Sequence, residues 1–137
     1  DFRYWQFGEN LTVTGLLETQ VCVGNVYRIG EALLQVTQPR VPCFKLALKM
    51  NDPAFVKRFM KAERSGWYLR VVAEGTIGAG DSITLEQEDP KQMSVQAINH
   101  LLYFEQDAGL ARQALDIEAL SPGWKGSFEE IVADAEA

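Results

Sequence analysis

A cysteine behind two prolines and next to two cations is the residue whose surroundings most suggest chemistry. Pro39 and Pro42 each fix φ near about −65° and favour an extended residue before them, so a stiff, non-helical loop is expected to end at Cys43. Arg40 and Lys45 lie close to the thiol in sequence. Nearby cations favour the thiolate, the form that acts as nucleophile and as soft-metal ligand. From spacing alone, a buried cysteine beside a turn is an equally good interpretation.

The second cysteine suggests packing instead. Cys22 stands between Val21 and Val23 and reads as a strand residue. The two cysteines lack the C-x-x-C spacing of a zinc or redox site and are too few for a disulfide scaffold. The single histidine, His100, lies within a predicted helix, where we expect a surface residue rather than a ligand.

Composition limits the class of protein. With 137 residues and 47% hydrophobic content, the chain can bury a sizeable core as one domain with an appendage. A net charge of −6 argues against a general nucleic-acid binder. The sequence contains no apolar run that could span a bilayer and no signal peptide, so a cytoplasmic protein is expected. Because it starts within the aromatic stretch DFRYWQFGEN, we expect residues to be missing before Asp1 or near Trp5 and Gln6.

Short strands are expected to build the first part of the chain. β-Branched stretches punctuated by glycine recur from Leu11 to Leu85: LTVTGL, VCVGNVYRIG, ALLQVTQPR, WYLRVVAEG and GDSITLEQ. Gly-Asn and Gly-Asp pairs, which are typical of turns, precede two of these strands. Such spacing favours a small antiparallel barrel over βαβ units. One inserted helix is expected to start after Asp52, with Phe55 and Phe59 on one face, and to end at Gly66.

Three short helices are expected after Asp89-Pro90. Ser94 can cap the first helix, and Asp107 and Gly109 end it. The second helix carries Leu110 and Ala114. Ser127 and Glu130 have the spacing of a capping box, which would start the third helix. Helices of this size bury little surface alone, so they must dock on the barrel or on a partner. We therefore divide the chain into residues 1–89 and residues 90–137.

Five phrases in order resemble one known family. FGENLTVTGL, VCVGNVYRIG, LLQVTQPRVPCFKL, GWYLRV and GDSITL are similar to the MOSC domain family, named for the C-terminal domain of molybdenum cofactor sulfurase. The resemblance covers nearly the whole chain. LLYFEQD and ALSPGW place it nearest the bacterial branch with a three-helix extension, which resembles the N-hydroxylaminopurine reductases. The resemblance implies a mostly β fold with added helices. A pyruvate kinase-like β-barrel with an inserted helix would be followed by the three-helix extension.

The resemblance also implies a cofactor and a reaction. In this family the barrel binds the molybdenum cofactor (molybdopterin), and the loop cysteine that Cys43 matches ligates molybdenum. The family activity is reduction of N-hydroxylated compounds, and pyridoxal phosphate binding is a further family-level association. A thiolate suits a thiophilic metal, and a rigid loop would leave other coordination positions open for substrate.

Other site residues are assigned on the same basis. Arg40 could bind the cofactor phosphate or an oxo ligand, and Lys45 could add a positive charge. Alternatively, either residue could be a solvated surface cation. Asn10 and Thr12 could bind the pterin, whereas Asn10 could also simply close a turn with its own backbone. Glu9 is the candidate for proton delivery. The upstream basic segment that supplies cofactor contacts in this family is not found in the sequence, which departs from the family pattern.

Three functions compete at this stage: a molybdoenzyme reducing N-hydroxylated bases, a sulfur or cofactor carrier without turnover, and a binding module that has lost its site. The sequence carries no flavin or iron-sulfur signature, so an enzyme would need an external electron-transfer protein. The acidic residues of the last helix could steer that partner, or they could be only a solvated face. They are Glu129, Glu130, Asp134 and Glu136.

Overall fold

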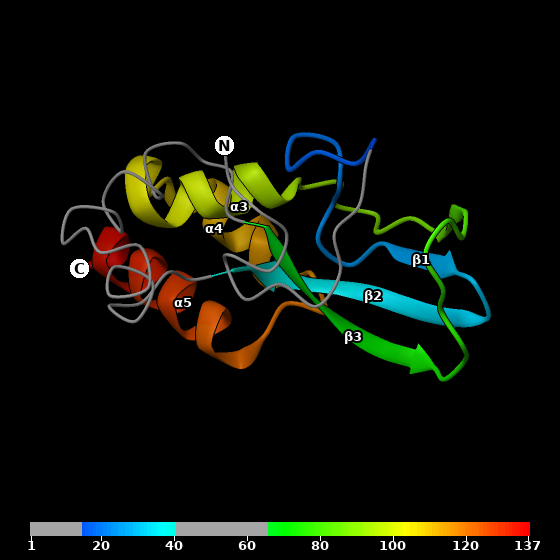
Figure 1. The fold of residues 1–137 in the computed structure, drawn as a ribbon. Helices are drawn as coiled ribbons and strands as arrows, with labels where there is room; N and C mark the ends of the chain where they lie inside the picture. Colours follow the sequence, from blue (N-terminus) through cyan, green and yellow to red (C-terminus); the bar gives the residue numbers. More distant parts are fainter. Residues whose placement is uncertain (1–14, 41–65) are drawn as a thin grey trace, which may run out of the picture.

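In the part of the chain that the structure describes, a four-stranded antiparallel sheet is followed by three helical segments. The computed structural model describes residues 15–40 and 66–137. The strands are β1 (Val26–Ile29), β2 (Ala32–Pro39), β3 (Trp67–Ala73) and β4 (Ile83–Gln87), in the sheet order β3-β2-β1-β4. Figure 1 labels β1, β2 and β3. The helices are α3 (Val95–His100), which continues as the π-helical turn η1 (Leu101–Glu105), then α4 (Ala108–Leu115) and α5 (Pro122–Glu136).

The sequence places the described strands correctly. Strands β1 and β2 form a hairpin in which Ile29 pairs with Ala32 around a two-residue loop. Gly30 starts that loop with φ of 57°, which a residue without a Cβ adopts at little cost. The turns predicted before β1 and β4 are also present: Asn25 N–H donates to the Cys22 carbonyl at 3.1 Å, and Asp81 N–H to that of Gly78 at 3.1 Å.

The VCV stretch before β1 is not a strand, contrary to the sequence interpretation. Cys22 forms only an isolated bridge with Ser94. The backbone groups on either side bond to the start of the helical region: Val23 N–H donates to the Met93 carbonyl at 3.0 Å, and Val95 N–H donates to that of Val21 at 2.7 Å. This stretch therefore joins the sheet to the helices instead of extending β1.

Sheet and helices share one hydrophobic core. Along β2, Leu34 and Val36 are buried, and they belong to the same cluster as Ile98, Leu101 and Phe128 from the helices. Figure 1 shows the helices gathered at one end of the sheet. The expectation that the helices must dock is confirmed, and their partner is the sheet. The domain division at residues 89 and 90 stays a prediction.

Two of the predicted helix boundaries are confirmed. The Ser94 hydroxyl accepts from Ala97 N–H at 3.0 Å and caps α3. The Asp107 carboxylate accepts from Leu110 N–H at 2.8 Å, so Asp107 separates the first helix from α4 by capping the second. Gly109 lies inside α4 and does not mark a boundary.

The predicted start of the third helix is wrong. Helix α5 begins at Pro122, after Ser121, so Ser127 and Glu130 lie in its interior. Proline suits the first helical position because the N–H it lacks would have no intrahelical partner there. The Ser127 hydroxyl donates to the Gly123 carbonyl one turn earlier at 3.3 Å instead of capping. Capping-box spacing can thus occur within a helix.

The predicted barrel extends beyond what the structure describes. Within residues 15–40 and 66–137, the four strands form an open sheet. The helix expected after Asp52, with Phe55 and Phe59, lies outside these ranges. Trp124 is buried, and its ring meets Tyr103 edge-on with centroids 6.1 Å apart. Among the described helices, none has both the length and the apolar character needed to cross a membrane.

Candidate functional site

Arg40 is the one predicted site residue within the described ranges. Cys43, Glu9, Lys45, Asn10 and Thr12 all lie outside them, so their predicted roles stay predictions.

Arg40 directly follows β2, and its side chain is half-buried. Its backbone N–H donates to the Gly66 carbonyl at 3.1 Å, and the preceding residue, Pro39, pairs with Trp67 of β3. The chain that carries Cys43 therefore leaves the sheet at Arg40 and re-enters it at Gly66, next to its point of departure.

Pro39 explains why β2 stops there. It is fully buried and pairs with β3, beyond the point where the β1 ladder ends at Gln35. Proline cannot donate to a ladder and is tolerated where one side of a strand has no partner. The β2–β3 register also shifts between Val36 and Gln38. Residues 39–43 form a P-x-x-P-C element. Its first proline, Pro39, thus fixes the point where the chain leaves the sheet.

The carboxylate of Glu18 binds the chain at Gly66, where it re-enters the sheet. Gly66 N–H donates to Glu18 Oε2 at 3.0 Å. The backbone of Glu18 is itself tied to the helices, because its carbonyl accepts from Gln96 N–H at 2.9 Å. Sequence reasoning missed Glu18, which lies 48 positions from Gly66 and carries no motif signal.

Cys22 has the environment of a packing residue. It is 7% exposed, and its Sγ lies 3.9 Å from the Gln20 carbonyl and 3.8 Å from Gln92 Oε1. Burial, and then the negative charges of Asp89 and Glu88, raise the pKa of the thiol. Both effects disfavour the reactive thiolate.

His100 ends α3 and is half-buried. Its ring lies against Phe104, with centroids 5.3 Å apart and planes at 34°. In residues 15–40 and 66–137, no three or more His, Cys, Asp and Glu side chains come together as a possible metal site.

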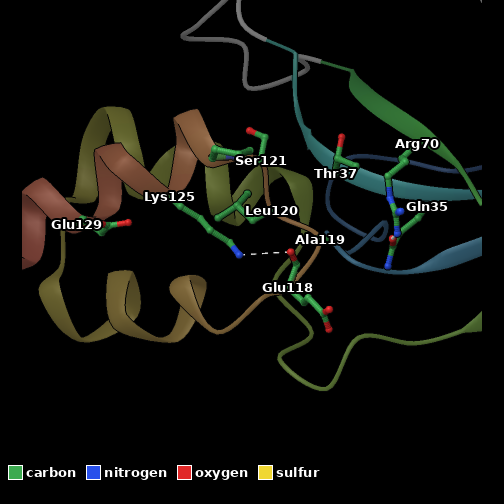
Figure 2. A pocket seen from close by; sticks show the side chains of 10 residues that line it. Gln35, Thr37, Arg70, Glu118, Ala119, Leu120, Ser121, Lys125 and Glu129 are labelled. Carbon is green, nitrogen blue, oxygen red and sulfur yellow. Dashed lines mark hydrogen bonds between the residues drawn. The ribbon is translucent and has the colours of Figure 1, made fainter.

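A cleft of about 730 Å³ lies between the sheet and the start of α5 (Figure 2). Seven polar residues line its wall: Gln35, Thr37, Arg70, Glu118, Ser121, Lys125 and Glu129. They come from β2, β3 and the α4–α5 connection with the first turns of α5. Of these seven, the sequence analysis singled out only Glu129, because no spacing rule links positions on three separate elements.

Most donors in the cleft already have protein partners. Arg70 donates to Gln35 Oε1, the Gln35 amide donates to the Gly24 carbonyl at 3.0 Å, and the Lys125 ammonium donates to the Glu118 carbonyl at 3.3 Å. The lining contains two cationic side chains and two carboxylates. They are Arg70 and Lys125, and Glu118 and Glu129. The cleft is polar but favours neither sign of ligand charge.

Comparison with known families agrees with this architecture. The model of the MOSC domain matches residues 1–84, and that of the YiiM-like 3-alpha helix domain matches residues 93–131. The chain belongs to the MOSC domain family, and its three-helix extension places it in the YiiM branch of that family. The resemblance inferred from the sequence is confirmed.

Three relatives illustrate the similarity. YflK of Bacillus subtilis is 41% identical over 123 residues, which cover 89% of this chain and 56% of that protein. A Gibberella moniliformis protein named reductase is 37% identical over 97 residues, covering 70% of this chain and 17% of that protein. The crystal structure of YiiM from Geobacillus stearothermophilus matches with a TM-score of 0.92 at 39% identity, covering 96% of this chain and 68% of that one. The chain thus spans about half of YflK and less than a fifth of the reductase.

Proposed function

We propose that this protein contributes to molybdenum-cofactor-dependent reduction of N-hydroxylated compounds such as N-hydroxylaminopurines. The observation that carries the proposal is the P-x-x-P-C element of a MOSC domain, whose sheet exit is built by buried Pro39 and by the Arg40–Gly66 hydrogen bond. The relative named reductase supports a reductive activity.

The donor set of the chain fits this cofactor chemically. Arg40, which is half-buried, stands at the start of the segment that carries Cys43. Its guanidinium offers planar, paired donors of the kind that bind phosphate. In the proposed site Cys43 would ligate molybdenum, Arg40 and Lys45 would bind the phosphate or an oxo group, and Asn10 with Thr12 would bind the pterin. When bound, the cofactor would supply two-electron chemistry that accepts an oxygen atom.

The overall reaction sets what the chain must provide. An N-hydroxylamine takes up two electrons and two protons, the N–O bond breaks, and an amine and water are released. Glu9 is the proposed proton donor, since a carboxyl group close to the departing oxygen can act as general acid. Arg40 would orient the anionic groups and hold a fixed positive charge through the reaction.

The proposal includes a complete barrel around this site. We infer that residues outside the described ranges close the four-stranded sheet into a pyruvate kinase-like β-barrel and that the helix expected after Asp52 plugs this barrel. The match of the MOSC model to residues 1–84 supports this inference.

Electrons would come from an external flavin or iron-sulfur protein. The supporting observation is the exposed acidic face of α5, formed by Glu129, Glu130 and Asp134. Glu136, the fourth acidic residue, instead pairs with Arg112 at 3.0 Å. These three exposed carboxylates would steer encounter with a basic surface of the donor, an effect that salt weakens.

Replacement of Cys43 tests the function. We expect Cys43→Ser protein, produced with an intact cofactor pathway, to lose molybdenum and hydroxylaminopurine reduction while its circular dichroism and melting midpoint stay near wild type. Cys22→Ser is the matched control and should keep both. An unaltered reduction rate in Cys43→Ser would remove this thiol from the mechanism, and labile sulfur without metal in the wild-type protein would favour a sulfur carrier instead.

A further inference from the structure

We propose that Glu18 is a positioning residue that holds the closing end of the segment carrying Cys43. The proposal rests on the proposed function only for the role of Cys43. Residues 41–65 lie between Arg40 and Gly66 in the chain. Gly66 N–H donates to the Glu18 carboxylate at 3.0 Å, and the Gly66 carbonyl accepts from Arg40 N–H at 3.1 Å. One side chain is thus bonded to the residue where the two ends of the segment meet.

Glu18 is fixed in turn by the helical extension. Its own carbonyl accepts from Gln96 N–H, in the first turn of α3, at 2.9 Å. The carbonyl of the preceding residue, Leu17, accepts from Gln20 N–H at 2.8 Å and from Val21 N–H at 3.0 Å, which closes the turn that presents the carboxylate. A continuous series of hydrogen bonds therefore runs from α3 through Glu18 and Gly66 to Arg40.

The bonding fits a positioning role better than a role in general stability. Glu18 is half-exposed and does not belong to the hydrophobic core, so its removal creates no cavity there. A hydrogen bond to a charged acceptor is stronger than a neutral one, and this one acts on a single backbone junction. Small displacements of a reactive group reduce rates strongly, so a local bond at this junction can affect chemistry far more than the melting temperature.

Three variants separate the roles. Glu18→Ala removes the acceptor, Glu18→Gln keeps an oxygen acceptor without the charge, and Glu74→Ala removes an exposed carboxylate elsewhere as a control. In Glu18→Ala we expect amide hydrogen exchange at Gly66 and Arg40 to accelerate about tenfold, as loss of a charge-assisted hydrogen bond implies. Exchange at Val36, whose N–H bonds to the carbonyl of Asn25 in the turn before β1, should stay unchanged. Glu18→Gln, whose neutral oxygen accepts a weaker hydrogen bond, should lie between Glu18→Ala and wild type, and Glu74→Ala should resemble wild type.

The consequence for the cysteine is measured separately, on metal-free protein. Alkylation of Cys43 by a maleimide, followed by peptide mapping, should be several-fold faster in Glu18→Ala, and Glu18→Gln should lie between Glu18→Ala and wild type. Reduction of hydroxylaminopurine by the loaded enzyme should fall in Glu18→Ala and recover in part in Glu18→Gln.

Two results would overturn the proposal. One is unchanged exchange at Gly66 and Arg40, or unchanged Cys43 alkylation, in Glu18→Ala. The other is faster exchange at Val36 as well, in both Glu18 variants, which would indicate general destabilisation. If wild-type protein holds no molybdenum and reduces nothing, the proposed function fails, while exchange and alkylation still decide the role of Glu18.

Discussion

The side-chain oxygen of Asn25 accepts a hydrogen bond from the backbone N–H of Asp89 at 2.8 Å. Asn25 is 3% exposed and lies in the turn before β1, whereas Asp89 follows β4 on the way to the helices. The backbone of Asn25 is satisfied as well, by Cys22 and Val36. This residue therefore joins three parts of the chain at the boundary between sheet and helices.

Replacing Asn25 should be costly. Asn25→Ala leaves the Asp89 N–H without its acceptor in a partly buried place, so we expect a loss of about 1–3 kcal/mol in the free energy of unfolding. Urea denaturation measures it. Gln113→Ala, which removes an amide from the exposed face of α4, is the control and should change stability by less than about 0.5 kcal/mol. Equal effects of the two substitutions would contradict the role given to Asn25.

Gly24 should tolerate no side chain. Its φ is 97°, and an added Cβ would lie 2.7 Å from Cγ and 2.8 Å from Cβ of Asp89. Gly80, with φ of 88° and open space around it, is a matched control that isolates the backbone strain. We expect Gly80→Ala to cost about 1–2 kcal/mol and Gly24→Ala to cost about 1–3 kcal/mol more. Thermal melts that show the same shift for both would mean that Asp89 simply moves aside.

Cys22 should contribute packing and no chemistry. We expect Cys22→Ala to keep full reductase activity and to lose about 1 kcal/mol of stability, because a small buried side chain is shortened. Activity and urea denaturation are measured on the same preparation. Folded but inactive Cys22→Ala protein would reverse the assignments of the two cysteines.

The raised pKa of the Cys22 thiol predicts a pH dependence of stability. A group that deprotonates less readily when folded contributes stability that is complete below its unfolded pKa and is lost as pH rises through the folded value. Urea midpoints should therefore fall from about pH 9.0, the ordinary pKa of the thiol, upward, and fall less in Cys22→Ala. Parallel curves for the two proteins would show that another group causes the alkaline loss.

Deleting residues 91–137 should unfold the sheet. Ile98, Leu101 and Phe128 are at most 1% exposed and share a core with Val21 and Val36. Their removal would expose that core, so we expect the truncated chain to lose cooperative melting by circular dichroism. Cooperative unfolding of residues 1–90 would instead establish an independent domain.

The proposed role of the acidic α5 face therefore needs substitutions rather than truncation. Neutralising Glu129, Glu130 and Asp134 together should slow reduction driven by a protein donor and leave reduction with a chemical reductant unchanged. The control neutralises Glu31, Glu74 and Glu88, which are exposed around the sheet. Identical slowing in both triple variants would indicate an effect of net charge rather than docking on α5.

The sequence by itself determined the local structure and the family. Stretches rich in β-branched residues and punctuated by glycine placed β2 and β3, glycine-containing turns preceded β1 and β4, and side-chain caps such as Ser94 marked helix starts. These signals act over a few residues, through backbone geometry and side-chain direction, and are therefore visible in the sequence. The ordered phrases that include the P-x-x-P-C element indicated the MOSC family.

Only the tertiary structure decided which distant groups meet. Capping-box spacing misplaced the start of α5, because the same spacing occurs inside a helix whose true start was set by Pro122. The VCV stretch looked like a strand, yet its backbone bonds to Met93 and Val95. The contact of Glu18 with Gly66 joins positions far apart in the chain, as do the walls of the cleft beside α5. Such contacts depend on how the complete core brings the elements together, and neither residue type nor periodicity within one element encodes that arrangement.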